Sequence, residues 1–312
     1  MRTLLIINPY SRNGKSGRLA KKVMERLRSK GFDFDYTEIN NFNDAYELSV
    51  KANKEGIDNI VAVGGDGTIN KVLNGFYNEK GKRISSSRFG VIHTGTSPDF
   101  CKSYNIPADP GEAADVIIGQ KIKNIPVGKI KLNTDAAGAK PQETKYFACC
   151  ANIGLGASLA RAAGTGIRAY LGDFLGTLVS FIRILLSYRG TAYRMAADGP
   201  LKEYKNVINI SVGITKYIAS GLKVYRDPAI EDKKFYVMKA SNIGLNNILK
   251  LLTTVYSGKH FNNTSYLDLS YAGRVEILRS EVNNEVEFDG DPAGFLPCII
   301  EMAEDRLPVF VS

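Results

Sequence analysis

The sequence predicts an α/β domain with a parallel sheet at residues 1–125 and a β-rich domain at residues 126–303. In the first part, apolar runs of strand length alternate with stretches of helical spacing, and polar or glycine-rich loops follow the runs. From residue 124 onward most segments alternate in the manner of β-strands, which indicates the second domain. A length of 312 residues also exceeds that of a typical single domain.

Composition and charge narrow the classes of function. With 44% hydrophobic and 23% charged residues, the chain has the composition of an ordinary globular protein. Its 41 Lys and Arg residues outnumber 32 Asp and Glu residues, and the net charge of +9 favours anionic partners such as nucleotide phosphates or an acidic membrane surface. The basic residues are dispersed and form no nucleic-acid-binding motif, so we do not expect nucleic acid as a partner.

Cysteine usage and the length of the apolar runs predict a cytoplasmic location. The cysteines lack the spacing of metal ligands and are expected to be buried, reduced thiols: Cys101, Cys149, Cys150 and Cys298. The N-terminal apolar run, Leu4–Ile7, is too short for the core of a signal peptide. The most apolar stretch, Phe174–Tyr188, is shorter than a membrane span and contains Arg183, which favours a helix packed in the core.

The first domain is predicted to begin with two strand–loop–helix units. In the first unit, the strand is Thr3–Ile7, and the helix that follows carries Leu19, Val23 and Leu27 on one side. In the second unit, the strand is Phe32–Thr37 and the helix spans Asp44–Glu55. The loop after the first strand contains Asn8, Ser11 and Lys15, which suit a phosphate contact. A capped, solvated loop is the alternative interpretation of these residues.

The central feature of the chain is the turn Gly64-Gly65-Asp66-Gly67-Thr68. It follows an apolar run, Ile60–Val63, typical of a buried strand, and precedes apolar residues at helical spacing. Glycines in such a turn permit positive φ and close approach of a ligand, and N–H groups at a helix N-terminus favour an anion. We therefore expect phosphate binding here, with Thr68 capping the helix and Asp66 orienting a water or a metal ion.

A third loop is expected at the same edge of the sheet. The predicted strand Phe89–Ile92 runs into polar residues from His93 to Phe100, and a short helix is predicted at Ala113–Ile118. Because the carboxyl ends of parallel strands meet at one edge, the three loops should lie together. A lone histidine at a strand end is more often structural than catalytic, and we assign His93 no catalytic role.

The second domain is predicted to be mainly β with at least two helices. Strands are expected at Val127–Leu132, Tyr146–Ala151, Thr191–Ala197, Val207–Gly213, Val275–Leu278, Val286–Phe288 and Leu307–Val311, and helices at Arg168–Arg189 and Ile243–Tyr256. Asp289-Gly290-Asp291 follows one of these strands. A turn rich in Asp and Gly is typical of a β-hairpin.

Two segments of the first domain resemble a known family. Gly64–Thr68 resembles the nucleotide loop shared by diacylglycerol kinases, sphingosine kinases and NAD kinases. Gly95, Thr96, Asp99 and Phe100 are similar to the Gly-Thr-x-Asn-Asp-Phe motif of the diacylglycerol kinase catalytic domain, which NAD kinases lack. In the second domain, Asn152–Gly156 resembles the family's Asn-x-Gly-x-Gly.

The resemblance extends over almost the whole chain and implies a lipid kinase. Asp289-Gly290-Asp291 is similar to the family's Asp-Gly-Glu, which implies that Asp289 is the general base. The implied fold is a Rossmann-like parallel-sheet domain followed by a β-sandwich-like domain, with residues 304–312 returning to the first domain. The resemblance further implies ATP in the interdomain cleft, Mg²⁺, and a lipid hydroxyl as acceptor, met peripherally at the membrane surface.

The same resemblance assigns the remaining site residues. ATP would be held by Asn8, Ser11, Gly64, Gly65, Asp66, Gly67, Thr68, Thr94, Gly95 and Thr96. The Mg²⁺ network would comprise Asp66, Asp99 and Asp291, acting largely through water.

Departures from the family pattern keep alternatives open. Pro98 stands where the family has Asn, Pro126 replaces an acidic residue, Asp291 is shorter than Glu, and Glu231-Asp232-Lys233 replaces Asp-Gly. One alternative is a kinase for another acceptor, namely a sphingoid base, phosphatidylglycerol or NAD. Another is a nucleotide- or lipid-binding regulatory protein that has lost catalysis. The oligomeric state, including a homodimer, is also left open.

Overall fold

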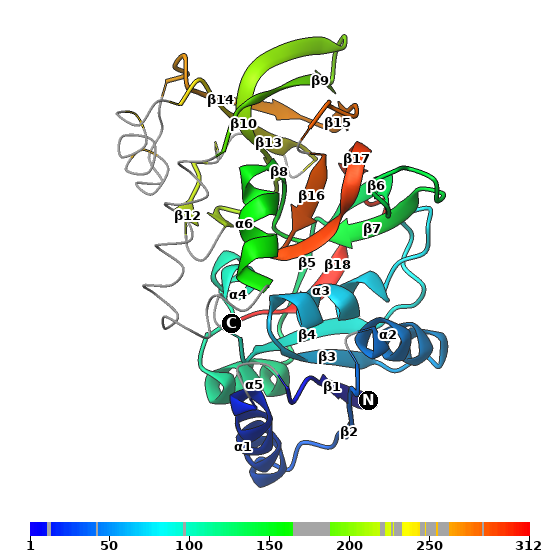
Figure 1. Cartoon of the computed structure of the whole chain (residues 1–312). Helices are drawn as coiled ribbons and strands as arrows, with labels where there is room; N and C mark the ends of the chain where they lie inside the picture. The colour runs from blue at the N-terminus through cyan, green and yellow to red at the C-terminus, as the bar shows by residue number, and fades with distance from the viewer. Residues whose placement is uncertain are drawn as a thin grey trace.

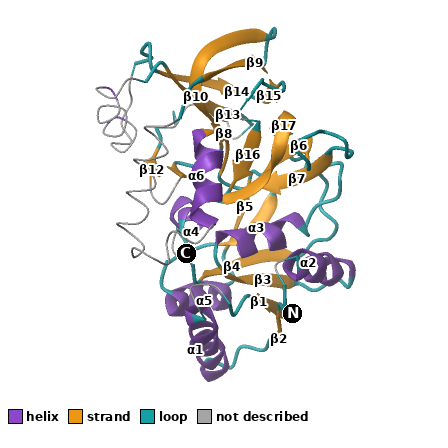
Figure 2. Cartoon of the chain, viewed as in Figure 1, coloured by secondary structure: helices purple, strands orange, loops and turns teal. Residues whose placement is uncertain are grey.

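The computed structural model describes residues 1–10, 14–41, 43–95, 98–164, 188–218, 222–225, 227, 233–243, 247, 254, 262–282 and 284–312. Within this part of the chain there are a six-stranded sheet, a larger antiparallel sheet and a two-stranded ribbon. Figures 1 and 2 show the six-stranded sheet and its helices at one end of the molecule, and the antiparallel sheet at the other.

The six-stranded sheet has the order β2-β1-β3-β4-β18-β5. Its strands are β1 (Thr3–Ile7), β2 (Asp35–Glu38), β3 (Asn59–Gly64), β4 (Arg88–His93), β5 (Ile122–Ile125) and β18 (Leu307–Phe310). Neighbouring strands are parallel except β18 and β5, which are antiparallel. The C-terminal strand β18 therefore lies in the same sheet as the N-terminal strand β1.

Helices cover both faces of this sheet (Figure 2). They are α1 (Lys15–Ser29), α2 (Asp44–Lys54), α3 (Asp66–Asn74), α4 (Asp99–Tyr104) and α5 (Pro110–Gly119). On one face α1 packs against α5, and on the other α2 packs against α3. The chain order reverses between β1 and β3, and in open α/β sheets the crevice beyond the carboxyl ends of strands at such a reversal is where ligands bind.

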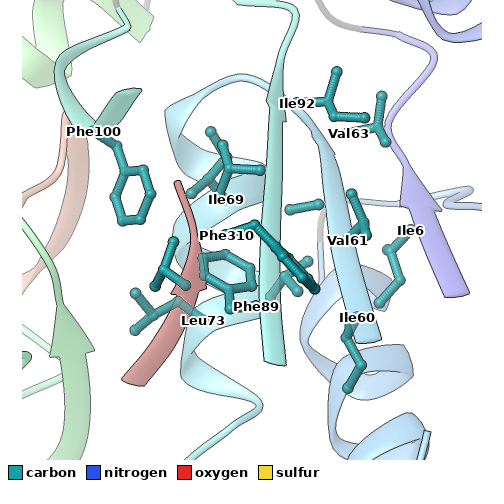
Figure 3. Close-up of a cluster of buried hydrophobic side chains, with 14 of the residues drawn as sticks. Ile6, Ile60, Val61, Val63, Ile69, Leu73, Phe89, Ile92, Phe100 and Phe310 are labelled. Carbon is teal, nitrogen blue, oxygen red and sulfur yellow. The ribbon is translucent and has the colours of Figure 1, made fainter. Parts of the chain in front are cut away.

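The core of the first part lies between the sheet and its helices. Figure 3 shows Ile69 and Leu73 of α3 with Phe89 of β4 and Phe310 of β18 in one apolar cluster. Because the central strands are buried on both faces, their sequences are almost continuously apolar, as expected for a parallel sheet. This packing holds α3, and with it the glycine turn at its N-terminus, rigidly on the sheet.

The second sheet is antiparallel throughout and closes on itself. Its strands are β6 (Gly128–Asn133), β7 (Glu143–Phe147), β8 (Cys150–Gly154), β9 (Thr191–Ala197), β10 (Lys202–Gly213), β13 (Phe235–Ser241), β14 (Leu267–Ala272), β15 (Arg274–Ile277), β16 (Glu285–Phe288) and β17 (Asp291–Met302). The closure arises because β9 pairs with both β15 and β10. Helix α6 (Leu155–Gly164) packs against β8 and β16, and β11 (Tyr217–Ile218) with β12 (Leu222–Lys223) forms the ribbon.

The predicted fold class is confirmed: a parallel-sheet domain and an antiparallel β-rich domain. One strand prediction is wrong. Residues 146–151 form not one strand but the end of β7 and the start of β8, with a bend at Ala148 and Cys149. The predicted helices Arg168–Arg189 and Ile243–Tyr256, together with the apolar stretch Phe174–Tyr188 and the substituted Glu231-Asp232, fall on residues that lie almost wholly outside those the structure describes.

Two further expectations concern the thiols and the membrane. All four cysteines are buried and unpaired, as predicted for reduced thiols. In the described part of the chain, no helix is long and apolar enough to cross a membrane.

Candidate active site

Three loops meet at the carboxyl ends of β1, β3 and β4, as the sequence predicts. The Asn8 N–H donates to Val63 O at 2.9 Å, which joins the first loop to the strand before the glycine turn. The Thr94 N–H donates to Gly64 O at 2.8 Å, and the Thr94 hydroxyl lies 2.5 Å from the Ser16 hydroxyl of α1. The third loop is thus joined both to the turn and to α1. Ser11 and Thr96 lie outside the described residues.

The glycines of the central turn act through close packing, because positive φ is not found at Gly64, Gly65 or Gly67. A Cβ on Gly64 would lie 2.6 Å from the Thr68 Cβ, and one on Gly95 would lie 2.7 Å from the Gly65 Cα. The expectation of positive φ is therefore wrong for this turn. Glycine is required at Gly64 and Gly95, because the helix behind the turn and the turn itself approach these two positions more closely than a side chain allows.

Thr68 does not cap α3, contrary to the sequence prediction. The N-cap position is Gly65, without a side-chain cap, and Asp66 is the first residue of the helix. The buried Thr68 hydroxyl instead accepts a hydrogen bond from Asn8 Nδ2 at 2.9 Å. The Thr68 side chain faces the β1 loop, and among the described residues no N-cap side chain bonds to the first turn of α3. An uncapped helix N-terminus suits an anionic ligand.

Asp289 occupies a β-hairpin turn between β16 and β17. Asp289 and Gly290 have φ of 51° and 90°, and Phe288 pairs with Asp291 across the hairpin. Two successive residues with positive φ are typical of the type I′ turn, which explains why Asp-Gly stands here. A non-glycine residue in this conformation is strained, and such residues cluster at functional sites.

The Asp289 carboxylate is half-buried and accepts four hydrogen bonds. Its Oδ1 accepts from the N–H groups of Cys149 (2.9 Å) and Cys150 (3.2 Å), and its Oδ2 accepts from the Ala148 N–H (2.9 Å) and from Asn70 Nδ2 (3.0 Å). This arrangement explains the break between β7 and β8, because the N–H groups at the bend point to the carboxylate. Burial raises the pKa of Asp289 to about 6, against the lowering effect of these donors.

Asn70 and Asn74 join α3 to the second sheet. Asn70 Nδ2 donates to Asp289 and also to Tyr146 O at 3.0 Å. Asn74 makes hydrogen bonds of 2.8 Å with both the N–H and the C=O of Tyr146, which lies on the β7 strand. The helix that begins at the glycine turn therefore also holds Asp289. Sequence analysis missed both asparagines, although their spacing of four places them on one face of a helix.

The four aspartates singled out by the sequence lie around Cys149 and Asp291: Asp289, Asp99 and Asp66 act on the first, and Asp66 and Asp289 on the second. The carboxylates of Asp289, Asp99 and Asp66 all add to the effect of burial in raising the pKa of the Cys149 thiol well above its usual value. Burial, together with the charge of Asp66, raises the pKa of Asp291 to about 6. The buried His93 Nε2 lies 3.5 Å from Asp66 Oδ2 and so faces the same cluster.

The donor set of this cluster fits a divalent cation held through water. Carboxylate oxygens are the ligands that Mg²⁺ prefers, and mutual repulsion among the aspartates would be relieved by a cation. Among the described residues, however, no three His, Cys, Asp or Glu side chains are arranged to hold a metal ion directly.

Glu287 is a further buried acid, which sequence analysis did not single out. Its Oε2 accepts from the Gly290 N–H at 3.1 Å, and its Oε1 accepts from Asn152 Nδ2. Burial raises the pKa of Glu287 from 4.5 to about 8, against the lowering effect of these hydrogen bonds. Its position two residues before Asp289 in an alternating strand is the only sequence signal.

The raised pKa of Glu287 predicts a pH-dependent stability. The folded state holds this proton more tightly than the unfolded state, so the contribution is complete below pH 4.5 and is lost as the pH rises through about 8. In metal-free buffer, the urea midpoint of the wild type should fall more between pH 5 and pH 8.5 than that of Glu287→Gln, which has no such proton. Equal falls in the two proteins would contradict the assignment.

Comparison with protein families identifies the two parts of the chain. Residues 2–130 match the diacylglycerol kinase catalytic domain, and residues 153–311 match the YegS C-terminal NAD kinase beta sandwich-like domain. The chain thus combines a diacylglycerol kinase catalytic domain with a YegS C-terminal NAD kinase beta sandwich-like domain, and the second match alone covers half of its length. The second match accounts for the closed antiparallel sheet, and together the two matches include the glycine turn, Asp99 and the Asp289 hairpin.

Proteins named diacylglycerol kinase are similar in sequence to nearly the whole chain. The chain is 26% identical over 297 residues to a diacylglycerol kinase of Bacillus subtilis, covering 95% of this chain and 91% of the relative. A diacylglycerol kinase of Staphylococcus aureus is 25% identical over 310 residues, covering 99% of this chain and 92% of the relative.

Solved structures show the same fold. A putative diacylglycerol kinase from Bacillus anthracis is similar with a TM-score of 0.75 at 20% identity, covering 100% of this chain and 97% of that one. A yeast NADH kinase complexed with NADH is similar with a TM-score of 0.54 at 10% identity, covering 100% and 84%. At these identities the likeness concerns the fold alone.

Proposed function

We propose that this protein is an ATP-dependent lipid kinase whose acceptor is the hydroxyl of diacylglycerol and whose product is phosphatidic acid. The observation that carries the proposal is the placement of α3. Its N-terminus is the glycine turn, and one helical turn further Asn70 holds Asp289. Donor phosphates at the turn and an acceptor hydroxyl at Asp289 would thus be positioned by one rigid helix.

Phosphoryl transfer requires alignment and charge neutralisation more than covalent help from the protein. In the proposed reaction the lipid hydroxyl oxygen attacks the γ-phosphorus, the bond between that phosphorus and the bridging oxygen breaks, and ADP leaves. An alcohol is too weakly acidic to be deprotonated in advance, so Asp289 would orient the hydroxyl and accept its proton late. The Asp289 carboxylate already accepts four hydrogen bonds, so the lipid hydroxyl would have to replace one of the four donors. Three of these donors are backbone N–H groups, and Asn70 is the one side chain among them.

Mg²⁺ would be held through water by Asp66, Asp99 and Asp291. When bound, it would neutralise charge on the phosphate oxygens. The N–H groups at the start of α3 would bind the phosphates, and Asn8 and Thr94 keep the surrounding loops in place by bonds to Thr68 and Gly64. We also propose that the first domain ends at residue 125, that the second spans residues 126–303, and that residues 304–312 return to the first domain.

The test is transfer of labelled phosphate from [γ-³²P]ATP to a panel of acceptors: diacylglycerol, a sphingoid base, phosphatidylglycerol and NAD. We expect labelled phosphatidic acid, identified by mass spectrometry, with stoichiometric ADP. Preferred labelling of another acceptor would replace diacylglycerol in the proposal. Nucleotide binding without transfer to any acceptor would overturn the kinase and favour a regulatory protein.

The shorter acid at position 291 predicts a high Mg²⁺ requirement. Asp291 is one methylene shorter than the Glu of the family motif, so its contact with a metal-bound water should be weaker. Asp291→Glu is expected to lower the Mg²⁺ concentration that gives half-maximal activity, measured by titration at saturating ATP. A higher requirement in Asp291→Glu would place Asp291 outside the metal network.

A lipid substrate also predicts reversible membrane binding. With a net charge of +9, the protein should bind vesicles that contain anionic phospholipid, and the bound fraction should fall as salt rises and screens the charges. Sedimentation with vesicles of phosphatidylcholine and phosphatidylglycerol at increasing NaCl measures this fraction. Binding that is unaffected by salt would contradict a peripheral, electrostatic association.

A further inference from the structure

A row of polar side chains, three of them buried and the fourth half-buried, connects the Asp289 hairpin to helix α6. It consists of Glu287, Asn152, Ser211 and Asn209, here called the Glu287 row. Glu287 Oε1 accepts from Asn152 Nδ2, and Asn152 Oδ1 accepts from the Ser211 hydroxyl at 2.5 Å. The Ser211 oxygen in turn accepts from Asn209 Nδ2 at 2.9 Å. The proposed reaction uses none of these side chains.

The strand register places this row on one face of the sheet. Glu287 of β16 pairs directly with Asn152 of β8, and Asn152 pairs with Ser211 of β10. Side chains at directly paired positions point to the same face, as do residues two apart such as Asn209 and Ser211. Helix α6 packs against β8, β10 and β16 (Figure 1), and the Gly156 N–H at its start donates to Asn209, so the row lies on the face that α6 covers.

Both ends of the row bind backbone N–H groups. At one end Glu287 Oε2 accepts from the Gly290 N–H, at 3.1 Å, within the hairpin that carries Asp289. At the other end Asn209 Oδ1 accepts from the Gly156 N–H, at 2.8 Å, in the first turn of α6. The row therefore forms a continuous hydrogen-bonded connection between the hairpin and the helix.

The row also explains the Asn152–Gly156 motif, which sequence analysis identified only by its resemblance to the family's Asn-x-Gly-x-Gly. Asn152 supplies the centre of the row. Gly154 has φ of 97°, and a Cβ there would lie 2.5 Å from Ile208 O. A Cβ on Gly156 would lie 2.7 Å from the Asn152 Cβ and 3.1 Å from Asn209 Oδ1. The glycines thus allow the chain to turn into α6 while leaving room for the two asparagines.

We infer that Glu287 and Asn152 are positioning residues, which hold the Asp289–Asp291 hairpin in its reactive geometry through the Gly290 N–H. Buried polar side chains stabilise a fold little compared with apolar ones of similar volume, so a fully bonded row is better explained by the geometry it enforces. Asp289 has a strained backbone conformation and needs such support. The effect of the Glu287 row on turnover rests on the proposed kinase activity, but the effect of the row on the hairpin does not.

The test compares Glu287→Met, which removes both acceptor atoms at similar length, with Glu287→Gln, which keeps one. Because small displacements of reacting groups cost large factors in rate, we expect Glu287→Met to lower kcat by about tenfold or more, measured with dioctanoylglycerol in mixed micelles. The KM for ATP should stay within about twofold, because phosphates are expected to bind at the first domain. Glu287→Gln should restore part of the lost kcat.

Asn53→Ala is the matched control. Asn53 is an equally buried polar residue of α2 whose Nδ2 donates to Ser49 O and Gly75 O, away from the hairpin. It should lose stability without losing kcat. Hydrogen exchange, read by mass spectrometry on peptides covering residues 285–296, should be faster in Glu287→Met than in Asn53→Ala.

The outcomes separate the inference from the proposed function. If the wild type transfers no phosphate but the hairpin exchanges faster in Glu287→Met, the kinase proposal fails and the positioning of the hairpin stands. The inference is overturned if Glu287→Met keeps the wild-type kcat, or if its kcat falls no more than that of Asn53→Ala. A change confined to the KM for ATP would also overturn it, because the row would then act on nucleotide binding.

Discussion

Asp289→Asn is expected to suppress phosphate transfer by about 10²–10⁴-fold at every Mg²⁺ concentration, the range that general base catalysis contributes. The amide cannot accept the hydroxyl proton. It also presents an N–H group where the carboxylate accepts either from Ala148 and Asn70 or from Cys149 and Cys150, so two of these donors lose their acceptor. We therefore expect a stability loss of about 1–3 kcal/mol, with ATP binding retained.

The control for this variant is Asp268→Asn. Asp268 is a carboxylate of the second sheet that pairs with Lys239 at 2.6 Å and has no part in the proposed site. It should lose stability while keeping turnover. Transfer of labelled phosphate measures turnover and calorimetry measures ATP affinity, so a loss of catalysis is distinguished from a loss of nucleotide binding. Rescue of Asp289→Asn by added Mg²⁺ would show that Asp289 anchors metal and does not accept the proton.

Gly65→Val is expected to weaken ATP binding by more than about 100-fold while the protein remains folded, because a branched side chain would occupy the space that a phosphate must approach. The fold should tolerate it, since Gly65 has φ of −83° and a Cβ would lie 3.6 Å from the Gly95 Cα, an ordinary contact. Calorimetry with a non-hydrolysable ATP analogue measures the affinity, and circular dichroism checks the fold.

Gly119→Val is the matched control, because it makes the same change in α5, where a Cβ would meet nothing within 4 Å. Its ATP affinity should equal that of the wild type. Gly95→Ala should behave differently from both, since its Cβ would lie 2.7 Å from the Gly65 Cα and must force the two loops apart. An unchanged affinity in folded Gly65→Val would remove the glycine turn from the nucleotide site.

Sequence analysis correctly predicted the features that depend on neighbours along the chain. The apolar run before Gly64 and the helical spacing after Thr68 suffice to place the glycine turn between a strand and a helix. The alternation before Asp289 and the Asp-Gly pair likewise suffice for the hairpin. These are local preferences of backbone conformation, which the residues carry wherever the segment lies.

The role of individual side chains in the glycine turn could not be predicted in the same way. Thr68 has the residue type of a cap but bonds with Asn8, which is sixty positions away in the chain. Gly64 is required by the close approach of Thr68, and Gly95 by that of Gly65, and the φ of Gly64 is not positive. Both outcomes depend on how β1, β3 and β4 lie side by side.

By itself, the sequence determined the two-domain α/β and β-rich architecture, the glycine turn, the Asp289 hairpin and the resemblance to diacylglycerol kinases. Only the tertiary structure decided that Asn70 meets Asp289, that the strand at residues 146–151 breaks to bind that carboxylate, and that Glu287 meets Asn152. Periodicity reports which face of an element is buried, but contacts between distant segments depend on strand register and on the packing of α3 against β7. Neither leaves a periodic signal in the chain.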